Sequence, residues 1–260
     1  MTTVTILGAG TLLPDAERAS PSHHVEGEHF SLLLDCGSGA MHGMARFGIS
    51  WRELSHFALS HFHTDHTGDL AALLWAFRHG AEGRDAPLTL LGPNGFRDYM
   101  RGLARAHGDF ILDPGFPLRI VECEGGRVWT DEEGGLVLQT CATPHTAGSV
   151  AFRVETGAVA IGYTGDTGPS SELDGFFRGV NLLIAECAVA ERSGEGNRLT
   201  PEDVAALLRA AEPDTTVLTH LYPPLEPDTL PDLIRGLGVT GTVLAGRDGM
   251  RFPLPAQAGS

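Results

Sequence analysis

Four side chains that can bind a metal ion fall within six residues of this chain, in the segment His61-Phe62-His63-Thr64-Asp65-His66. The apolar residues 57–60 before it are typical of a buried strand, and the residues after Gly68 predict the start of a helix. In extended backbone, the side chains of residues 61, 63 and 65 lie on one side, and a turn brings His66 to them. We therefore expect a metal site here, and one suited to two ions. The simpler alternative is a polar turn that happens to be rich in histidine.

Three further metal-binding side chains follow expected strands elsewhere in the chain. They are His145, Asp166 and His220, which come after the apolar segments 135–142, 158–163 and 216–219, respectively. Taken singly, each is as well explained by a structural histidine or by turn chemistry. Their repetition is more informative, because open α/β sheets place their sites at the carboxyl ends of strands. We therefore expect these three side chains to join the first cluster.

The whole set resembles the pattern of the metallo-β-lactamase superfamily, which is H-x-H-x-D-H followed by His, Asp and His at later strand ends. The resemblance covers nearly the whole chain and implies a four-layer αβ/βα sandwich. It assigns one metal ion to His61, His63 and His145, and a second to Asp65, His66 and His220, with Asp166 bridging both. Asp35 matches an early aspartate of the family that supports a ligand from behind, where a carboxylate fixes the tautomer of a ligand imidazole. The alternative for Asp35 is a turn residue after a strand.

The remaining pattern alternates strands and helices, which predicts an α/β protein. Expected strands cover residues 3–8, 29–35, 55–60, 87–91, 117–122, 135–142, 149–155, 158–163, 181–185, 215–219 and 241–245. Expected helices cover residues 38–47, 68–79, 94–107, 169–178, 200–212 and 227–237. Residues 19–27 and 191–197 are expected to be mobile loops. Two halves meet near residue 150 without a linker and both supply ligands, so we expect residues 1–260 to form a single domain.

Within the superfamily, the chain is most similar to the ribonuclease Z-like and phosphodiesterase branch. The similarity is carried by residues 8–14, 34–39, 163–167 and 185–187. In that branch a glutamate and a histidine assist catalysis. Glu186 matches the glutamate, whereas Arg198 stands where the histidine is expected. The competing interpretation of Arg198 is a surface residue before a helix, because Thr200 and Asp203 have the spacing of a capping box.

The resemblance implies two divalent metal ions, with zinc favoured and manganese or iron possible, since imidazole and carboxylate ligands suit all three. Two such ions about 3.5–4 Å apart can share a hydroxide and polarise the bond under attack. Asp65, Glu186 and Arg198 are the candidate catalytic residues. Arginine suits phosphate binding but is a poor proton donor. We therefore expect hydrolysis of a small or activated phosphodiester, an anionic small-molecule substrate.

Other functions remain open at this stage. A hydrolase of carboxylic esters, lactones or β-lactams would use the same metal centre. A transfer-RNA 3′-processing endonuclease is disfavoured because residues 146–165 hold no insertion long enough for a transfer-RNA-gripping arm. A diiron redox protein is disfavoured because its branch usually has an acidic residue where His63 stands. A noncatalytic metal-binding protein would not need the complete ligand set.

Composition narrows the partners. The net charge is −15, with 33 acidic residues against 18 basic ones, all of them arginine, which disfavours extended nucleic-acid binding. Arg97, Arg101 and Arg105 share one face of an expected helix, either as a solvated face or as a positive stripe for an anionic substrate. No apolar run approaches the roughly 20 residues of a membrane span. The N-terminus lacks a signal-peptide pattern, and the four cysteines are scattered, so we expect a cytoplasmic protein, with a homodimer possible.

Overall fold

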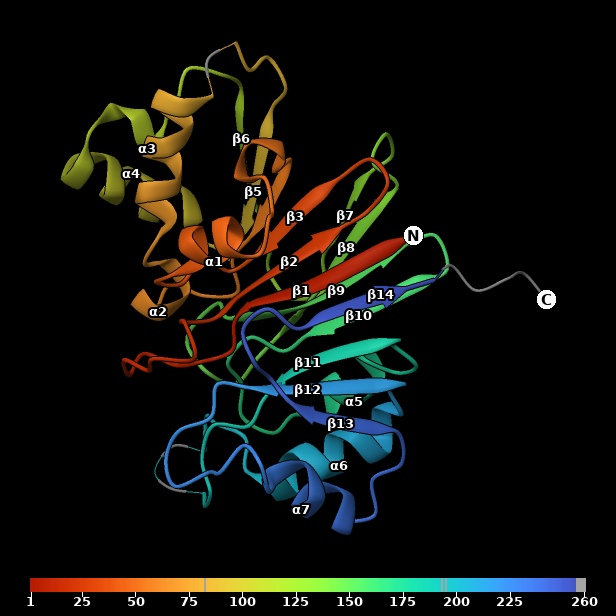
Figure 1. Ribbon diagram of the computed structural model, residues 1–260. Coiled ribbons are helices and arrows are strands. Elements are labelled where there is room, and N and C mark those ends of the chain that lie inside the picture. Colours follow the sequence, from red (N-terminus) through yellow and green to blue (C-terminus); the bar gives the residue numbers. More distant parts are fainter. Residues whose placement is uncertain (82, 193, 195, 256–260) are drawn as a thin grey trace.

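The computed structural model describes residues 1–81, 83–192, 194 and 196–255, and contains two seven-stranded sheets that pack face to face (Figure 1). The first sheet has the order β14 (Arg251–Leu254), β1 (Thr2–Gly8), β2 (Ser22–Glu26), β3 (Ser31–Leu34), β4 (His56–Ala58), β5 (Leu88–Gly92) and β6 (Leu118–Glu122). The second has the order β13 (Thr242–Ala245), β12 (Thr215–Thr219), β11 (Leu182–Glu186), β10 (Val159–Tyr163), β9 (Val150–Thr156), β8 (Leu136–Ala142) and β7 (Val128–Asp131).

Helices cover the outer face of each sheet (Figure 1). The first sheet carries α1 (Ala40–Arg46), α3 (Leu70–Gly80) and α4 (Phe96–His107), and the second carries α5 (Ser171–Phe176), α6 (Pro201–Ala211) and α7 (Leu230–Gly236). The short helix α2 (Thr64–Thr67) precedes α3, and two 3₁₀ turns span Trp51–Glu53 and Asp109–Ile111. Three apolar clusters fill the interfaces: one lies between the sheets, and one lies between each sheet and its helices. The fold is therefore the expected four-layer αβ/βα sandwich.

The two sheets have the same internal design. Strands β1 to β3 and β7 to β10 pair antiparallel, whereas β3 to β6 and β10 to β13 pair parallel. Parallel pairing requires crossover connections, and helices supply most of them, which brings the carboxyl ends of successive strands to one edge. The loops after β4, β10 and β12 leave from these edges. Among the described residues, no helix is long and apolar enough to cross a membrane.

Most expected elements are present, but the prediction of a loop over residues 19–27 is wrong. Residues 22–26 form β2, which pairs with β1 on one side and β3 on the other. Its Ser22, His23, His24 and Val25 are buried. Polar composition favours a loop only when the segment is solvated, and here tertiary packing overrides it. Strands β7 and β14, both half-exposed, were also not predicted.

Two further differences concern the ends of elements. Strand β4 ends at Ala58 rather than at Ser60, because the backbone N–H of Ser60 donates to a side-chain oxygen of Asp35 instead of to a strand. The ligand-rich segment therefore continues as a loop into α2. The expected mobile loop at residues 191–197 includes residues 193 and 195, which lie outside the described residues.

Because β2 is buried, its histidines make the stability of the fold depend on pH. Burial lowers the pKa of His24 to about 4, and the nearby Arg251 adds to this effect. His24 stays neutral in the folded protein, while the unfolded chain takes up a proton below about pH 6.5. The stabilisation is therefore complete above that pH and is lost as the pH falls towards 4.

We expect His24→Gln to flatten this dependence in the metal-free protein. Between pH 6.5 and 4, its free energy of unfolding should fall less steeply than that of the original protein, by up to about 1.4 kcal/mol per pH unit. Urea unfolding at several pH values measures the slope. His29→Gln, at an exposed position, is the control and should keep the original slope. Equal slopes for all three proteins would contradict the prediction.

Candidate metal centre

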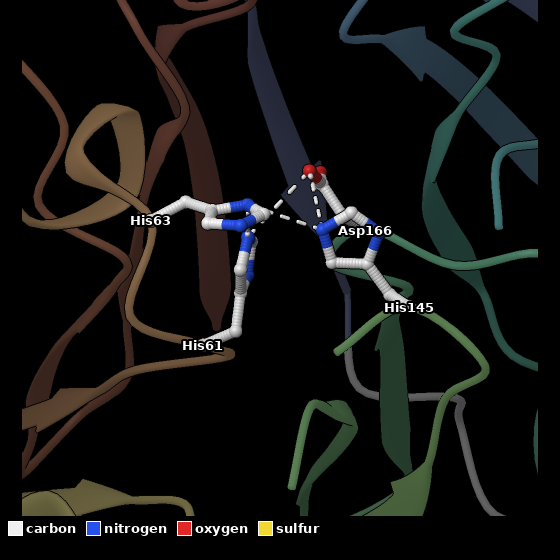
Figure 2. Close-up of side chains that lie close together, drawn as sticks. All are labelled: His61, His63, His145 and Asp166. Carbon is white, nitrogen blue, oxygen red and sulfur yellow. Dashed lines mark hydrogen bonds and ion pairs between the residues drawn. The ribbon is translucent and has the colours of Figure 1, made fainter. Parts of the chain in front are cut away.

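Three imidazoles and one carboxylate meet where the two sheets adjoin (Figure 2). His61 and His63 come from the loop after β4, and His145 and Asp166 approach from the loops after β8 and β10. Nδ1 of His63 lies 2.9 Å from Nε2 of His61 and 3.2 Å from Nε2 of His145. Burial lowers the pKa of both His61 and His145, so each ring is neutral and can offer a lone pair to a cation. We call these three histidines the first group.

A second group lies deeper and consists of Asp65 and His66, both on α2, and His220, which follows β12. Nε2 of His220 lies 3.2 Å from Oδ2 of Asp65, and Nε2 of His66 lies 3.8 Å from the same oxygen. All three side chains are buried, whereas His63 of the first group is exposed to solvent. The first group is therefore nearer to the surface.

Asp166 lies between the two groups and turns one carboxylate oxygen towards each. Its Oδ2 lies 3.6 Å from Nε2 of His61 and 3.5 Å from Nε2 of His145. Its Oδ1 lies 3.3 Å from Nε2 of His66 and 3.5 Å from Nε2 of His220. The structure thus brings all seven side chains singled out in the sequence to one place.

Two buried polar atoms of this cluster are arranged as ligands of a common cation rather than as a hydrogen-bonded pair. Nε2 of His66 and Oδ1 of Asp166 have no hydrogen-bond partner among the residues that the structure describes. Buried polar atoms are normally satisfied, so unpartnered ones need an explanation. Nδ1 of His66 lies 2.6 Å from Oδ2 of Asp35, which keeps a proton on that nitrogen and makes Nε2 the nitrogen that would bind a cation in place of a second proton. Nε2 of His66 and Oδ1 of Asp166 therefore face a common point, as metal ligands do.

The carboxylate of Asp35 holds several residues of the centre in place through hydrogen bonds. Its carboxylate accepts hydrogen bonds from the backbone N–H and the hydroxyl of Ser60, both at 2.7 Å, and from His66 and the Tyr163 hydroxyl, both at 2.6 Å. Burial lowers the pKa of His66, but Asp166 and Asp35 together offset this and raise it well above its ordinary value in the metal-free protein. A turn role alone does not explain Asp35, because it accepts hydrogen bonds from the candidate ligand His66 and from Tyr163.

The backbone around the centre is constrained as well. Asp35 and His220 have positive φ angles of 54° and 61°, a left-handed conformation that is uncommon for residues other than glycine. Gly37 packs against α2 so closely that a Cβ atom would lie 2.1 Å from the carbonyl oxygen of Asp65. Strained or close-packed backbone of this kind persists only where the surrounding structure fixes it. The loop after β3 and helix α2 therefore hold each other in place.

Glu186 and Arg198 complete the cluster from the second sheet. Glu186 is buried at the end of β11, and its Oε1 accepts a hydrogen bond from the backbone N–H of Thr167. Nη1 of Arg198 donates to Oδ2 of Asp166 and lies 3.4 Å from Oε2 of Glu186. Burial and Asp166 raise the pKa of Glu186, and Arg198 opposes this rise.

The surface interpretation of Arg198 is contradicted, since its side chain is only 20% exposed and contacts two buried carboxylates. The capping box at Thr200 and Asp203 is nevertheless present, and α6 begins after it at Pro201. Burial lowers the pKa of Arg198, but Asp166 and Glu186 offset this and raise it, so the guanidinium remains charged. The cap and the site contact are therefore compatible, because the cap uses no atom of Arg198.

The sequence did not reveal every residue around the centre. Ser60, Tyr163 and Tyr222 were not singled out, although Tyr163 lies three residues before Asp166. The ring of Tyr222 lies 5.3 Å from that of His220 and about 6.0 Å from the guanidinium carbon of Arg198. Tyr222 lies only two positions after His220, but its contact with Arg198 joins two loops that are distant in sequence, so no spacing rule could have indicated that contact.

The exposed arginines of α4 are partly engaged by their own surroundings. Arg97 donates to the backbone carbonyl of Ile120 on β6, and Arg101 forms an exposed ion pair with Asp98 at 2.7 Å. Exposed pairs of this kind contribute little to stability. The solvated helix face accounts for these contacts without a substrate.

Comparisons with known proteins agree with this geometry. The family model described as a β-lactamase superfamily domain matches residues 31–221. A protein named ribonuclease Z from Mycobacterium sp. (strain KMS) is 31% identical over 250 residues, which cover 87% of this chain and 86% of that protein. Among solved structures, the metallo-β-lactamase fold protein YhfI from Bacillus subtilis aligns with a TM-score of 0.83 and 21% identity, covering 96% of this chain and 98% of that one.

The short form of human tRNase Z aligns with a TM-score of 0.77 and 22% identity, covering 97% of this chain and 99% of that one. At such identities the structural likeness shows the fold alone. The matched family model and the mycobacterial relative also show the family, because they cover most of the sequence. The chain therefore belongs to the metallo-β-lactamase superfamily of metal-dependent hydrolases, in its ribonuclease Z-like branch.

Proposed function

We propose that this protein is a dinuclear metal-dependent phosphodiesterase that hydrolyses a small or activated phosphodiester. The main support for the proposal is that Asp166 turns one carboxylate oxygen towards each of the two groups of candidate ligand atoms. The guanidinium of Arg198 lies beside it. The first group would hold one ion and the second group the other, with Asp166 between them. Imidazole and carboxylate donors favour zinc, with manganese or iron as alternatives.

When bound, two such ions supply an activated water and positive charge at the bond under attack. The chain's own residues orient these parts. Asp35 fixes the tautomer of His66, and Asp65 completes the deeper group on the same helix. Glu186 holds the loop that carries Asp166 through the backbone of Thr167, and it contacts Arg198 at the same time.

Arg198 supports a phosphodiester rather than a neutral substrate. Its guanidinium lies at the metal centre, carries a permanent charge and offers a planar fork of donors that matches phosphate oxygens. It cannot act as a proton donor at neutral pH. The enzyme should therefore favour substrates with leaving groups that depart without protonation, such as aryl phosphodiesters.

The loops around the centre support a small substrate. Strands β9 and β10 form a hairpin that is joined by residues 157 and 158 alone, so the chain between His145 and Asp166 is short. The acidic net charge of −15 also disfavours a long nucleic-acid contact. The second candidate is transfer-RNA 3′ processing, which the similarity to a protein named ribonuclease Z favours.

A substrate panel separates these functions. We expect measurable turnover of a chromogenic aryl phosphodiester, with slower turnover of a lactone, a β-lactam and a neutral carboxylic ester. A precursor transfer RNA should be cleaved poorly. The zinc-loaded protein is assayed against all five substrates at equal concentration. Efficient 3′ cleavage of the precursor with little phosphodiester turnover would favour the second candidate instead.

The proposed two-ion centre predicts the metal content. The reconstituted protein should bind close to two equivalents of zinc per chain, and a chelator should abolish phosphodiester hydrolysis. Asp65→Ala removes a carboxylate of the second group and should reduce the content to about one equivalent. Elemental analysis after equilibration against buffered free zinc gives the stoichiometry. A maximum of one equivalent that Asp65→Ala leaves unchanged would show that the centre is not dinuclear.

The role of Arg198 predicts a selective change in kinetics. With zinc at saturating concentration, Arg198→Ala should raise KM for the phosphodiester about tenfold or more, since hydrogen bonds to charged groups contribute about 1.5–3 kcal/mol. Slow hydrolysis of a neutral ester should be spared, because it offers no anion to bind. Arg235→Ala, in an exposed ion pair on α7, is the control. Equal effects on both substrates would remove Arg198 from substrate binding.

A further inference from the structure

Arg198 occupies a position that the proposed function does not by itself explain. Its Nη1 donates to Oδ2 of Asp166, the oxygen that faces Nε2 of His61 and of His145. The same nitrogen lies 3.4 Å from Oε2 of Glu186 and 3.4 Å from Nδ1 of His220. A fixed cation therefore already neutralises the carboxylate oxygen that a metal ion in the first group would use.

In the second group, Arg198 reaches only Nδ1 of His220 and contacts no carboxylate oxygen that this group would use. The second group's share of Asp166 is Oδ1, which is buried and has no hydrogen-bond partner among the described residues. Asp65 adds a second carboxylate, and Asp35 increases the basicity of His66 through a hydrogen bond of 2.6 Å. The first group offers three imidazoles and only the oxygen of Asp166 to which Arg198 already donates. The negative charge available to a cation thus differs sharply between the two groups.

We propose that Arg198 acts as a tethered cation that competes with the metal ion of the first group, so that one ion is held tightly and the other weakly. The inference rests on the proposed two-ion centre and adds an order of binding to it. The second group should fill first. An ion in the first group must share Oδ2 of Asp166 with a guanidinium, and two cations on one oxygen repel each other.

The residues around Arg198 hold its guanidinium next to Asp166, where it would compete with a metal ion. Glu186 is buried and anchored by the backbone of Thr167, so it holds the guanidinium close to Asp166. Arginine cannot lose its proton in proteins, which means that raising the pH does not release Oδ2. His63, the outermost ligand of the first group, is exposed, so the weakly held ion can exchange with solvent. The weaker expected affinity of the first group for zinc and the exposure of His63 therefore both indicate that the ion of the first group is the exchangeable one.

Zinc binding to the metal-free protein tests this directly, without an activity assay. Competition with a chelating dye should resolve two binding steps of unequal affinity in the original protein. Arg198→Gln should tighten the weaker step by at least about tenfold, the size expected when a charge-assisted hydrogen bond no longer competes. The stronger step should change by less than about threefold, because its oxygen carries no arginine contact. Arg235→Gln changes the net charge equally at an exposed position and should leave both steps unchanged.

A second variant assigns the steps and remains informative if Arg198→Gln fails to fold, which circular dichroism and thermal unfolding would reveal. His63→Ala removes a ligand of the first group only, and its position is exposed. It should abolish the weaker step and retain the stronger one. Loss of the stronger step in His63→Ala would overturn the proposal.

The remaining outcomes separate this inference from the proposed function. Two equal steps in the original protein, or a weaker step that Arg198→Gln leaves unchanged, would overturn the role of Arg198 while the two-ion centre stands. An equal gain in both steps would show a general charge effect and also overturn it. A single zinc equivalent in the original protein would instead contradict the dinuclear centre itself.

Discussion

The carboxylate of Asp35 is the constraint on which the centre depends. It is fully buried, and a buried charge is tolerated only when hydrogen bonds satisfy it. The four donors come from Ser60, His66 and Tyr163, which lie after β4, on α2 and at the end of β10. One side chain thereby joins the two sheets and fixes the orientation of a candidate ligand. Loss of any donor would leave part of the charge unsatisfied, so these elements are mutually dependent.

The design of the sheets explains why the centre forms where it does. Each sheet changes from antiparallel to parallel pairing partway across, and the parallel strands end at the same edge. The loop after β4 in the first sheet and the loops after β10 and β12 in the second meet there, each carrying histidine or aspartate. Neither half holds all the ligand atoms, so packing of the sheets through their shared apolar core completes the centre.

Charge within the centre is unevenly distributed, and this gives the two groups different characters. The second group combines Asp65 with His66, which Asp35 supports, whereas the first group has imidazoles and one oxygen of Asp166. Arg198 adds a permanent positive charge beside that oxygen. In a protein with a net charge of −15, Arg198 is thus a fixed positive charge in contact with the centre.

The sequence by itself determined the elements whose causes are local. Most strands and helices, and the cap at Thr200, follow from periodicity and turn chemistry over a few residues. The short spacing of His61, His63, Asp65 and His66 is visible in the sequence itself. Membership of the superfamily followed from that same short motif together with the later strand ends.

Only the tertiary structure decided the features that depend on distant partners. Residues 22–26 form a buried strand because β1 and β3 flank them, although their composition favours a loop. Tyr163 reaches Asp35 across 128 positions, and Arg198 reaches Asp166 across 32. Such contacts depend on how the sheets pack, and packing is a property of the whole chain that no short segment encodes.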